Sequence, residues 1–488
     1  MDKDFKYIPK DKRKKILLIC DDIRVHSGVA TIAKEIVMHT SQHFNWVQIA
    51  GSINHPEKNK RLDLSPSTNE ITGLEDSSII LYPSDGYGST QMIREIIKIE
   101  KPDALFLFTD PRYFMHIWNM EQEIRKNIPI TYLNIWDDLP FPRWNEDFYE
   151  SCDLLMAISK QTYNINKHVC QRKPRIEGKD LFYTPHGIDE NKYFPISPSE
   201  PDQIAFKNKS TNFEDFEFIA FLNSRNIRRK GIADLLAGFK LFRSKLPKDK
   251  QDKVAVILHT DPVDSNGTDL PVVADALDPD MKVIFSTQKL PTSALNRLYN
   301  IADVVCNPSS AEGFGLSHME AMMSGTPTIT TVVGGLQDQM GFRTTKSVDG
   351  IEGAAEKQFI TVEDFTAEVP SNSTGMMTEE HGPWTYPLWP NQSIQGSPST
   401  PYIYDSRPTI EDIALGLRYW YDAGSDERKR CGAIGRDWAI ENGFTAKDMC
   451  NDTAIAVKTC LENFTPRQRY IIIDTATPKP KYPVGDLI

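Results

Sequence analysis

Short apolar runs alternate with amphipathic segments along the chain, a pattern typical of an α/β protein. The first run, KKILLICDD at residues 14–22, is rich in isoleucine and leucine and predicts a buried strand that ends at Asp21 and Asp22. A loop containing glycine follows it, and residues 29–42 then place apolar side chains at helical spacing. This order of strand, glycine loop and helix predicts the opening unit of a doubly wound domain.

The same alternation continues in two series. Runs such as WVQIA, DALFLF, ITYLNIW and CDLLMAIS predict parallel strands of a first domain at residues 1–195. The polar segment 197–215 predicts a linker or surface loop, and a second series of strands, starting with FEFIAFLN, predicts a second domain at 196–440. Residues 441–488 predict a last helix and a proline-rich tail that pack back on the N-terminal domain.

The rhythm breaks once, over residues 343–405, where proline, glycine, serine and threonine are frequent. This stretch also holds HGPWTYPLWP, and a free linker has no need of so many aromatic side chains. We therefore expect an ordered insertion. The helical pattern of IEDIALGLRYWYDA then resumes the second domain.

Composition agrees with a multidomain globular protein: the chain has 488 residues, of which 40% are hydrophobic and 25% charged. It has no apolar stretch of membrane-spanning length and no signal-like N-terminus, which predicts a cytoplasmic protein. Its seven cysteines form no CxxC pair, so we expect reduced thiols. A net charge of −11 argues weakly against a nonspecific nucleic-acid coat.

The stretch AEGFGLSHMEAMMSGTP at 311–327 carries the main candidate chemistry. Gly313 and Gly315 allow close approach of a ligand where a predicted strand meets a predicted helix, and the free amides and dipole of that helix favour an anion. The backbone from Gly313 through Phe314 to Leu316 is thus expected to cradle a phosphate or diphosphate.

Two carboxylates flank this cradle at a separation of eight positions. Glu320 lies one or two turns into the helix, where it is placed to accept hydrogen bonds from ribose hydroxyls. Glu312 precedes the cradle and is placed to hold a group on the far side of the phosphate. Together they predict a nucleotide-sugar pocket. The alternative is that both are surface charges on a strand-to-helix turn.

These residues resemble the Glu-x7-Glu motif of retaining family 4 glycosyltransferases, which have the GT-B fold. The similarity extends through EGFGLSHMEAMMSGTPTITTVVGG. It implies two Rossmann-like doubly wound domains that face each other across a cleft. A second motif, NSRNIRRKG, resembles the Arg-x4-Lys-Gly element of the family and gives Arg225 and Lys230 as clamps on the donor diphosphate. We interpret the intervening Arg228 and Arg229 as a solvated charge run.

Weaker resemblances add further donor contacts. The loop HSGVAT around Gly28 is similar to the first glycine loop of the family, which packs against the donor phosphates. FYTPHGIDENKYF at 182–194 resembles the interdomain element. The segment STQKLPTSALNRLYNIADV resembles the part that contacts the nucleotide base, which implies that Gln288 and Leu290 read the base.

One departure from the family concerns the end of a first-domain strand. Many relatives carry a His-Asp pair there, whereas this chain has Trp136 followed by Asp137. Asp137 is placed to orient an acceptor hydroxyl or to take its proton. The alternative is that Asp137 and Asp138 cap the following turn.

The resemblance implies transfer of a hexosyl or pentosyl group, with retention, from a nucleoside-diphosphate sugar, which we expect to be UDP-linked. We expect no metal and no other cofactor. His39 and His43 lie four apart without an acidic or thiol partner in the pattern, and Asp278-x-Asp280 lies in a predicted turn.

The acceptor is the least determined part. DDIRVHSGVATIAKEIV, DGYG, TDPRYF and NIWDDLPFPRWN resemble a subgroup carried by large tailed phages, some of whose members modify hydroxymethylated pyrimidines in DNA. KDKRKK at 10–15 and the aromatic residues of 381–390 are candidate DNA contacts, or else a solvated face and a structural plug. Alternative acceptors are a surface polysaccharide, a lipid or a small molecule. A nucleotide-sugar epimerase and a non-catalytic nucleotide-sugar binding protein are the alternatives from other classes.

Overall fold

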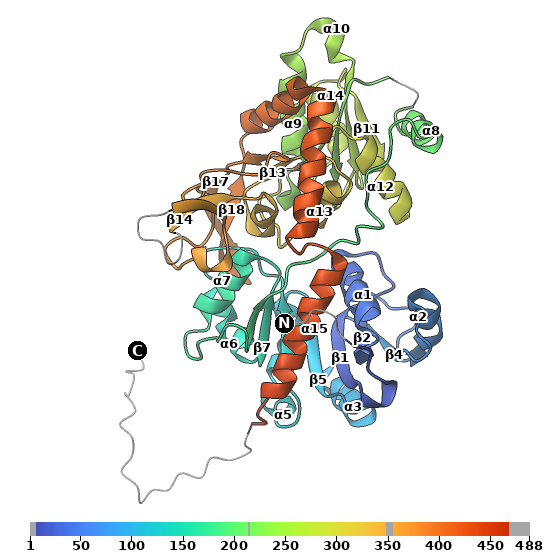
Figure 1. Cartoon of the computed structure of the whole chain (residues 1–488), viewed down its shortest axis with the longest axis vertical. Helices are drawn as coiled ribbons and strands as arrows, with labels where there is room; N and C mark the ends of the chain where they lie inside the picture. The colour runs from blue at the N-terminus through green and yellow to red at the C-terminus, as the bar shows by residue number, and fades with distance from the viewer. Residues whose placement is uncertain (1–5, 213–214, 348–354, 468–488) are drawn as a thin grey trace, which may run out of the picture.

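The computed structural model describes residues 6–212, 215–347 and 355–467 of the chain. It consists of two α/β domains stacked along the long axis of the molecule, the first half of the chain forming the lower domain in Figure 1. Two long helices at the end of the described chain, α14 (Ile410–Glu441) and α15 (Ala446–Asn463), run from the upper domain to the lower one. Within these described residues, none of the helices combines the length and hydropathy that a membrane crossing requires.

The N-terminal domain is built on an eight-stranded sheet of order β3-β4-β2-β1-β5-β6-β7-β8. Its strands are β1 (Lys14–Asp21), β2 (Phe44–Ser52), β3 (Leu62–Asp63), β4 (Ile79–Asp85), β5 (Ala104–Phe108), β6 (Ile130–Asn134), β7 (Leu154–Ala157) and β8 (Leu181–Tyr183). All neighbours are parallel except β3, which pairs antiparallel with β4. In β1, Ile16 and Leu18 enter one apolar core while Leu17 and Ile19 enter another. Both faces of the strand are buried, which explains its unbroken apolar run.

Helices on both faces connect these strands (Figure 1). They are α1 (Gly28–Thr40), α2 (Ser65–Thr72), α3 (Thr90–Glu100), α4 (Met115–Trp118), α5 (Glu121–Ile124), α6 (Glu146–Glu150) and α7 (Lys160–Val169). The hydroxyls of Ser27, Ser89 and Ser159 accept the backbone N–H of the third residue after each and so cap α1, α3 and α7. Helix starts are thereby fixed at the carboxyl ends of the strands that precede them.

The C-terminal domain holds a six-stranded sheet of order β11-β10-β9-β12-β13-β16, with every neighbouring pair parallel. Its strands are β9 (Phe218–Asn223), β10 (Val254–His259), β11 (Val283–Ser286), β12 (Val304–Asn307), β13 (Thr328–Thr331) and β16 (Thr385–Leu388). Its helices are α8 (Pro201–Ser210), α9 (Ile232–Ser244), α10 (Lys248–Gln251), α11 (Leu270–Leu277), α12 (Thr292–Ile301) and α13 (Leu316–Met323), together with α14, which is broken at Gly424. The two doubly wound domains predicted from the sequence are therefore confirmed.

The prediction of a linker or loop at 197–215 was wrong over its central part, where the chain forms α8. Proline at the first position, Asp202 in the first turn and Lys207 and Lys209 in the last turn suit the helix dipole. The helix is mostly solvent-facing, with Gln203 as its buried residue, so it has little apolar periodicity to reveal it.

The stretch predicted to be an ordered insertion contains regular structure. Two antiparallel hairpins, β14 (Arg343–Ser347) with β15 (Ala355–Phe359) and β17 (Asn391–Ser397) with β18 (Thr400–Arg407), flank the central strand β16. The stretch therefore also supplies the last strand of the C-terminal sheet. Trp384, just before β16, is 3% exposed, and its indole donates to the Gln339 carbonyl at 3.0 Å.

The chain passes between the domains twice, once after β8 and once between α14 and α15. The two passages are hydrogen-bonded to each other: Ile188 N–H donates to the Phe444 carbonyl at 3.0 Å, and Ala446 N–H donates to the Ile188 carbonyl at 3.1 Å. A Cβ at Gly187 would lie 2.0 Å from the Thr445 carbonyl oxygen, so only glycine allows this contact. After the second passage, α15 packs against α1 and β7 of the N-terminal domain. The predicted tail at 468–488 lies outside the described residues.

A role in DNA contacts requires the basic segment KDKRKK to lie near the cleft, but it lies far from the cleft. It precedes and begins β1, whose other end, at Asp21, faces the second domain; eight strand residues separate the two ends by about 25 Å. Its charges are also paired locally, Arg13 with Asp76 at 2.6 Å and Lys14 with Asp103 at 2.8 Å. Apart from Arg13, which is buried, the basic residues of the segment are exposed or half-buried, as the alternative interpretation of a solvated face expects.

Candidate active site

The loop between β12 and α13 lies at the interface of the two domains. Gly315 adopts φ +95° immediately before α13, a conformation that favours glycine. At Gly313 a Cβ would lie 3.1 Å from the backbone oxygen of Ile135, which follows β6 in the other domain. The carboxyl ends of strands from both sheets therefore meet at this loop, the usual place for ligands in parallel α/β folds.

Glu312, at the start of this loop, is held by two cations from the turn after β9. Its Oε2 accepts from Lys230 Nζ and, at 3.1 Å, from Arg229 Nη1. The side chains of Glu312 and Lys230 are only 13% and 14% exposed. Burial acts to raise the pKa of Glu312, but the two cations outweigh it and the pKa is lowered. Burial, reinforced by Arg229, lowers the pKa of Lys230.

Arg229 is a site residue that the sequence analysis assigned to a solvated charge run. The turn η4 (Arg228–Lys230) carries it, together with Lys230, onto Glu312. Arg225, by contrast, is 63% exposed, and its Nε donates to Asp264 Oδ2 at 2.9 Å. No spacing in the sequence distinguishes Arg229 from Arg228, so only the geometry of the turn reveals it.

Asp137 and Asp138 approach Glu312 from the loop after β6. Burial raises the pKa of Asp137, with Arg229 lowering it and Glu312 raising it further. Burial and the neighbouring Asp137 raise the pKa of Asp138 well above its ordinary value. The structure therefore brings Asp137, Arg229, Lys230 and Glu312 together as one charge cluster between the domains.

Trp136, which precedes the two aspartates, points away from this cluster into the core. It is 6% exposed, its indole donates to the Asp138 carbonyl at 3.0 Å, and the guanidinium of Arg112 lies 5.4 Å from the centre of its ring. Its role is thus to support the loop that presents the two aspartates.

A small pocket of about 20 Å³ opens beside Asp137. Its wall is mostly hydroxyl and amide groups, contributed by Gln161, Ser310, Ser371, Ser373, Gln392, Tyr404 and Ser406. The β17–β18 hairpin closes one side of it and is anchored to the N-terminal domain, where Tyr404 N–H donates to the Leu139 carbonyl at 2.6 Å. We call this the hydroxyl pocket.

Glu320 lines a much larger cavity, of about 780 Å³, between α1 and the C-terminal domain. Its carboxylate accepts from Tyr299 at 2.6 Å and from Tyr193 at 3.1 Å. Burial raises the pKa of Glu320, although both tyrosine hydroxyls act to lower it. Tyr193 and Tyr299 could not be predicted from the sequence, because a lone tyrosine on a helix or loop gives no motif signal. We call this space the cleft cavity.

Of the other residues predicted to bind the donor, Leu316 lines this cavity and Gly28 lies beside it, whereas Phe314 lies in the core. A Cβ at Gly28 would lie 3.4 Å from the side chain of Leu316, which lines the cleft cavity, so these two loops are neighbours. Phe314 is instead buried in the core, between the rings of His186 and Phe444.

Gln288 and Leu290 lie in the loop before α12 and, in the described structure, are not among the residues that line the cleft cavity. Gln288 is exposed and Leu290 half-buried. From this part of the chain, Thr292 at the start of α12 reaches the cavity. The base-reading role of Gln288 and Leu290 stays a prediction.

In the part of the chain that the structure describes, one group has the geometry to hold a metal ion: Glu35, His39 and Asp189. The ammonium of Lys192 already lies among them, 2.6 Å from Glu35 and 3.1 Å from Asp189. A cation is therefore supplied by the chain itself, and we assign no metal to this group.

Solved structures of other proteins share this architecture. The protein has the GT-B fold of glycosyltransferases, with two Rossmann-like domains facing each other. Anabaena Alr3699/HepE in complex with UDP and glucose superposes with a TM-score of 0.61 over 92% of this chain and 100% of its own, at 14% identity. Sucrose-phosphate synthase from Thermosynechococcus elongatus gives a TM-score of 0.60 over 91% of this chain and 97% of its own, at 15% identity.

Residues 202–345 match the family described as glycosyl transferases, group 1. Mannosylfructose-phosphate synthase from Agrobacterium fabrum is 28% identical over 192 residues, 38% of this chain and 39% of its own. Alpha-monoglucosyldiacylglycerol synthase from Acholeplasma laidlawii is 25% identical over 38% of this chain and 43% of its own. The similarity thus spans about two fifths of these relatives.

Proposed function

We propose that the protein is a retaining glycosyltransferase that takes a sugar from a UDP-linked donor and passes it to a hydroxyl acceptor. The observation that carries this proposal is the pairing of Lys230 and Arg229 with Glu312 at the glycine loop between the two domains. Such a cluster offers positive charge to a leaving diphosphate and a carboxylate to sugar hydroxyls within one buried site.

We assign the donor contacts by position. The backbone amides from Gly313 to Leu316, with Lys230 and Arg225, would bind the diphosphate, and Glu320 the ribose in the cleft cavity. Arg225 would have to exchange its present partner, Asp264, for the donor. Because protein cations compensate the leaving charge, we propose that the reaction requires no metal.

The acceptor hydroxyl would enter beside Asp137. The hydroxyl pocket supplies polar groups that can orient a hydroxylated acceptor, and an ionised Asp137 can accept its proton. Attack from the face that the diphosphate leaves would retain the anomeric configuration. The domain contact at Gly313 would exclude water from the reacting atoms.

A saccharide, a lipid or another small molecule is the acceptor class that we favour. Two relatives in the comparison are named for the synthesis of a sugar phosphate and of a glycolipid. Of the features proposed for DNA contacts, the basic segment lies at the far end of β1. Among the aromatic residues of 381–390, Trp384 is a core residue, whereas Trp389 is 38% exposed. Hydroxymethylated pyrimidine in DNA remains an alternative acceptor, which the following experiment tests.

Mass spectrometry of acceptors tests the proposal directly. The protein is incubated with UDP- and GDP-sugars and with methyl glycosides, diacylglycerol, plain DNA and hydroxymethylcytosine DNA. We expect one UDP-sugar to add a glycosyl mass to an acceptor, and Glu312→Gln to abolish it. Conversion of the donor without an acceptor would indicate an epimerase. UDP binding without any mass gain would indicate a binding protein and contradict transfer.

The pH dependence of transfer should reveal Asp137. Because burial raises its pKa above the ordinary 3.8, kcat/KM is expected to fall as the pH falls through that raised value, where Asp137 becomes protonated. Arg229→Gln removes the charge that lowers this pKa, so the acid limb should move to higher pH. Initial rates across the pH range measure the shift.

Arg225→Gln is the matched control for this measurement, because Arg225 pairs with Asp264 and not with the charge cluster. It should leave the acid limb in place whatever its effect on the rate. An acid limb that is identical in the wild type and Arg229→Gln would exclude Asp137 as the titrating group.

A further inference from the structure

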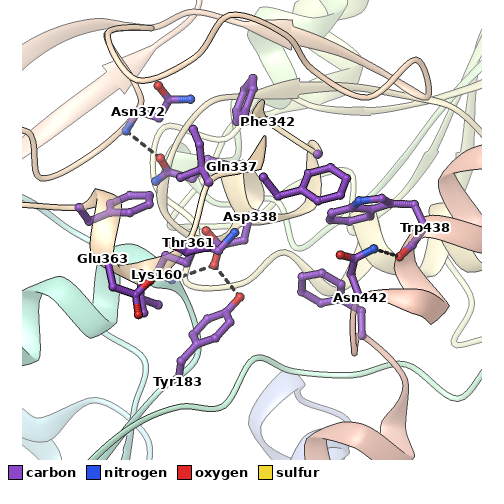
Figure 2. A pocket seen from close by; sticks show the side chains of 16 residues that line it. Lys160, Tyr183, Gln337, Asp338, Phe342, Thr361, Glu363, Asn372, Trp438 and Asn442 are labelled. Carbon is purple, nitrogen blue, oxygen red and sulfur yellow. Dashed lines mark hydrogen bonds between the residues drawn. The ribbon is translucent and has the colours of Figure 1, made fainter. Parts of the chain in front are cut away.

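A third pocket, of about 370 Å³, lies close to the hydroxyl pocket but is separate from it. Gln337 forms the partition: it lines this space, while its amide donates to Gln161 at 3.0 Å and to the Gly334 carbonyl at 2.8 Å, both of which line the hydroxyl pocket. We call this third pocket the aromatic pocket. Figure 2 shows it between the N-terminal domain, the insertion and the end of α14.

The name comes from the rings that line it. These are Phe342, Phe359, Phe365, Trp438 and Phe444. The Trp438 ring lies 5.9 Å from Phe359 and 5.5 Å from Phe444, centre to centre, so three of the rings form a continuous apolar wall. Such a wall suits a ligand with a C–H face.

Polar groups also line this pocket, and three side-chain atoms of its lining residues have no hydrogen-bond partner among the described residues. They are Asp338 Oδ1, Asn372 Nδ2 and Trp438 Nε1. Asp338 and Asn372 are 3% and 1% exposed. Buried polar atoms of this kind are rare because they lose their contacts with water, so each calls for a partner.

The rest of each side chain is fixed by the fold. Asp338 Oδ2 accepts from Lys160 N–H at 2.8 Å and from Tyr183 at 3.0 Å, contacts that are drawn in Figure 2. Asn372 Oδ1 accepts from Met377 N–H at 3.2 Å. The free atoms are therefore held in place as one acceptor on Asp338 and two donors, on Asn372 and Trp438.

This combination selects among classes of ligand. An apolar ligand satisfies none of the three atoms, and an organic cation leaves the two donors unpaired. A phosphate would face the carboxyl of Asp338 and that of Glu363 at the rim. Hydroxyl groups both donate and accept, so a hydroxylated ring can pair with all three atoms while its C–H face packs on the aromatic wall.

We propose that the aromatic pocket binds a neutral saccharide ring, at a site distinct from the donor cleft. Burial raises the pKa of Asp338, although Lys160 and Tyr183 act to lower it. Thr361, Glu363 and Asn442 are exposed lining residues and form the entrance. The inference goes beyond glycosyl transfer, because it concerns binding of a free sugar unit away from the reacting atoms.

Saturation-transfer NMR and calorimetry with the full chain test the site. The probes are methyl glycosides of glucose, galactose, mannose and N-acetylglucosamine, with UDP present to fill the cleft. We expect at least one glycoside to bind. Trp438→Phe, which keeps a ring but removes the donor, and Asn372→Asp, which keeps the contact with Met377, should each weaken binding about three- to tenfold.

Trp389→Phe is the matched control, because Trp389 packs on Phe342 outside the pocket lining and should leave affinity unchanged. Absence of binding for every glycoside overturns the proposal, as does binding that Trp438→Phe and Asn372→Asp do not alter. Binding of tetramethylammonium or inorganic phosphate, but no glycoside, also overturns it. Failure of transfer from UDP-sugars is a separate result, since binding is measured without a donor sugar.

Discussion

Lys230→Met is expected to reduce glycosyl transfer by about 10²- to 10³-fold, the usual cost of removing a preorganised charge from a developing anion. Lys230 is buried against Glu312 and positioned before any donor arrives. Methionine preserves most of its volume, and Arg229 still pairs with Glu312, so the variant should fold. Initial rates with saturating acceptor, together with thermal unfolding, measure both effects.

Lys240→Met provides the control, since Lys240 is an exposed lysine on α9 and its loss should leave the rate unchanged. If Lys230→Met folds normally and retains full kcat, the leaving-group role of the cluster is refuted. A variant that loses kcat but binds UDP as well as the wild type would show that the lysine acts mainly in the transition state.

Gly334→Ala is expected to destroy activity and to cost more than about 3 kcal/mol of stability. Gly334 adopts φ +46°, and a Cβ there would lie 2.0 Å from the Glu312 carbonyl oxygen and 3.5 Å from Asp137. The backbone of Glu312 would have to move away, and displacement of a reacting group by about 1 Å costs about 100-fold in rate. Denaturant unfolding and initial rates are the measurements.

Gly73→Ala separates the cost of a positive φ from the cost of a steric clash at the new Cβ. Gly73 also has positive φ, +73°, but its Cβ would meet nothing within 4 Å. It should therefore show only the backbone cost of about 1 kcal/mol and keep full activity. Equal losses of stability in the two variants would mean that close approach to Glu312 contributes nothing.

The central strands could be predicted from the sequence because both faces of each are buried, which gives unbroken apolar runs such as β1 and β9. Helix α8 could not, because its one buried residue leaves no periodicity. Strand β16 was hidden for a different reason. It is four residues long, contains a proline and lies between two hairpins of low hydrophobicity.

Some residues of the candidate active site could likewise be predicted from the sequence, and others could not. Glu312, Lys230 and Asp137 were predicted because motifs tie each of them to a strand end, and the structure places all three in one cluster; their roles stay predictions. Arg229 and the two tyrosines on Glu320 depend on side chains that meet only after the domains pack. The aromatic pocket is a stronger case, since its lining comes from Lys160, Tyr183 and the segments 337–342, 359–372 and 438–444, which are distant in the sequence.

The ladder that joins Ile188 to Phe444 and Ala446 determines how the halves of the molecule are able to move. Two independent connections would permit the domains to twist and slide against each other. These two connections are hydrogen-bonded to each other and form a single hinge line. We therefore expect the cleft between the domains to open for substrate exchange by rotation about this hinge line. Residues far from this hinge line would move most, whereas Gly187 and Phe314, whose ring packs on Phe444 beside the hinge line, would scarcely shift.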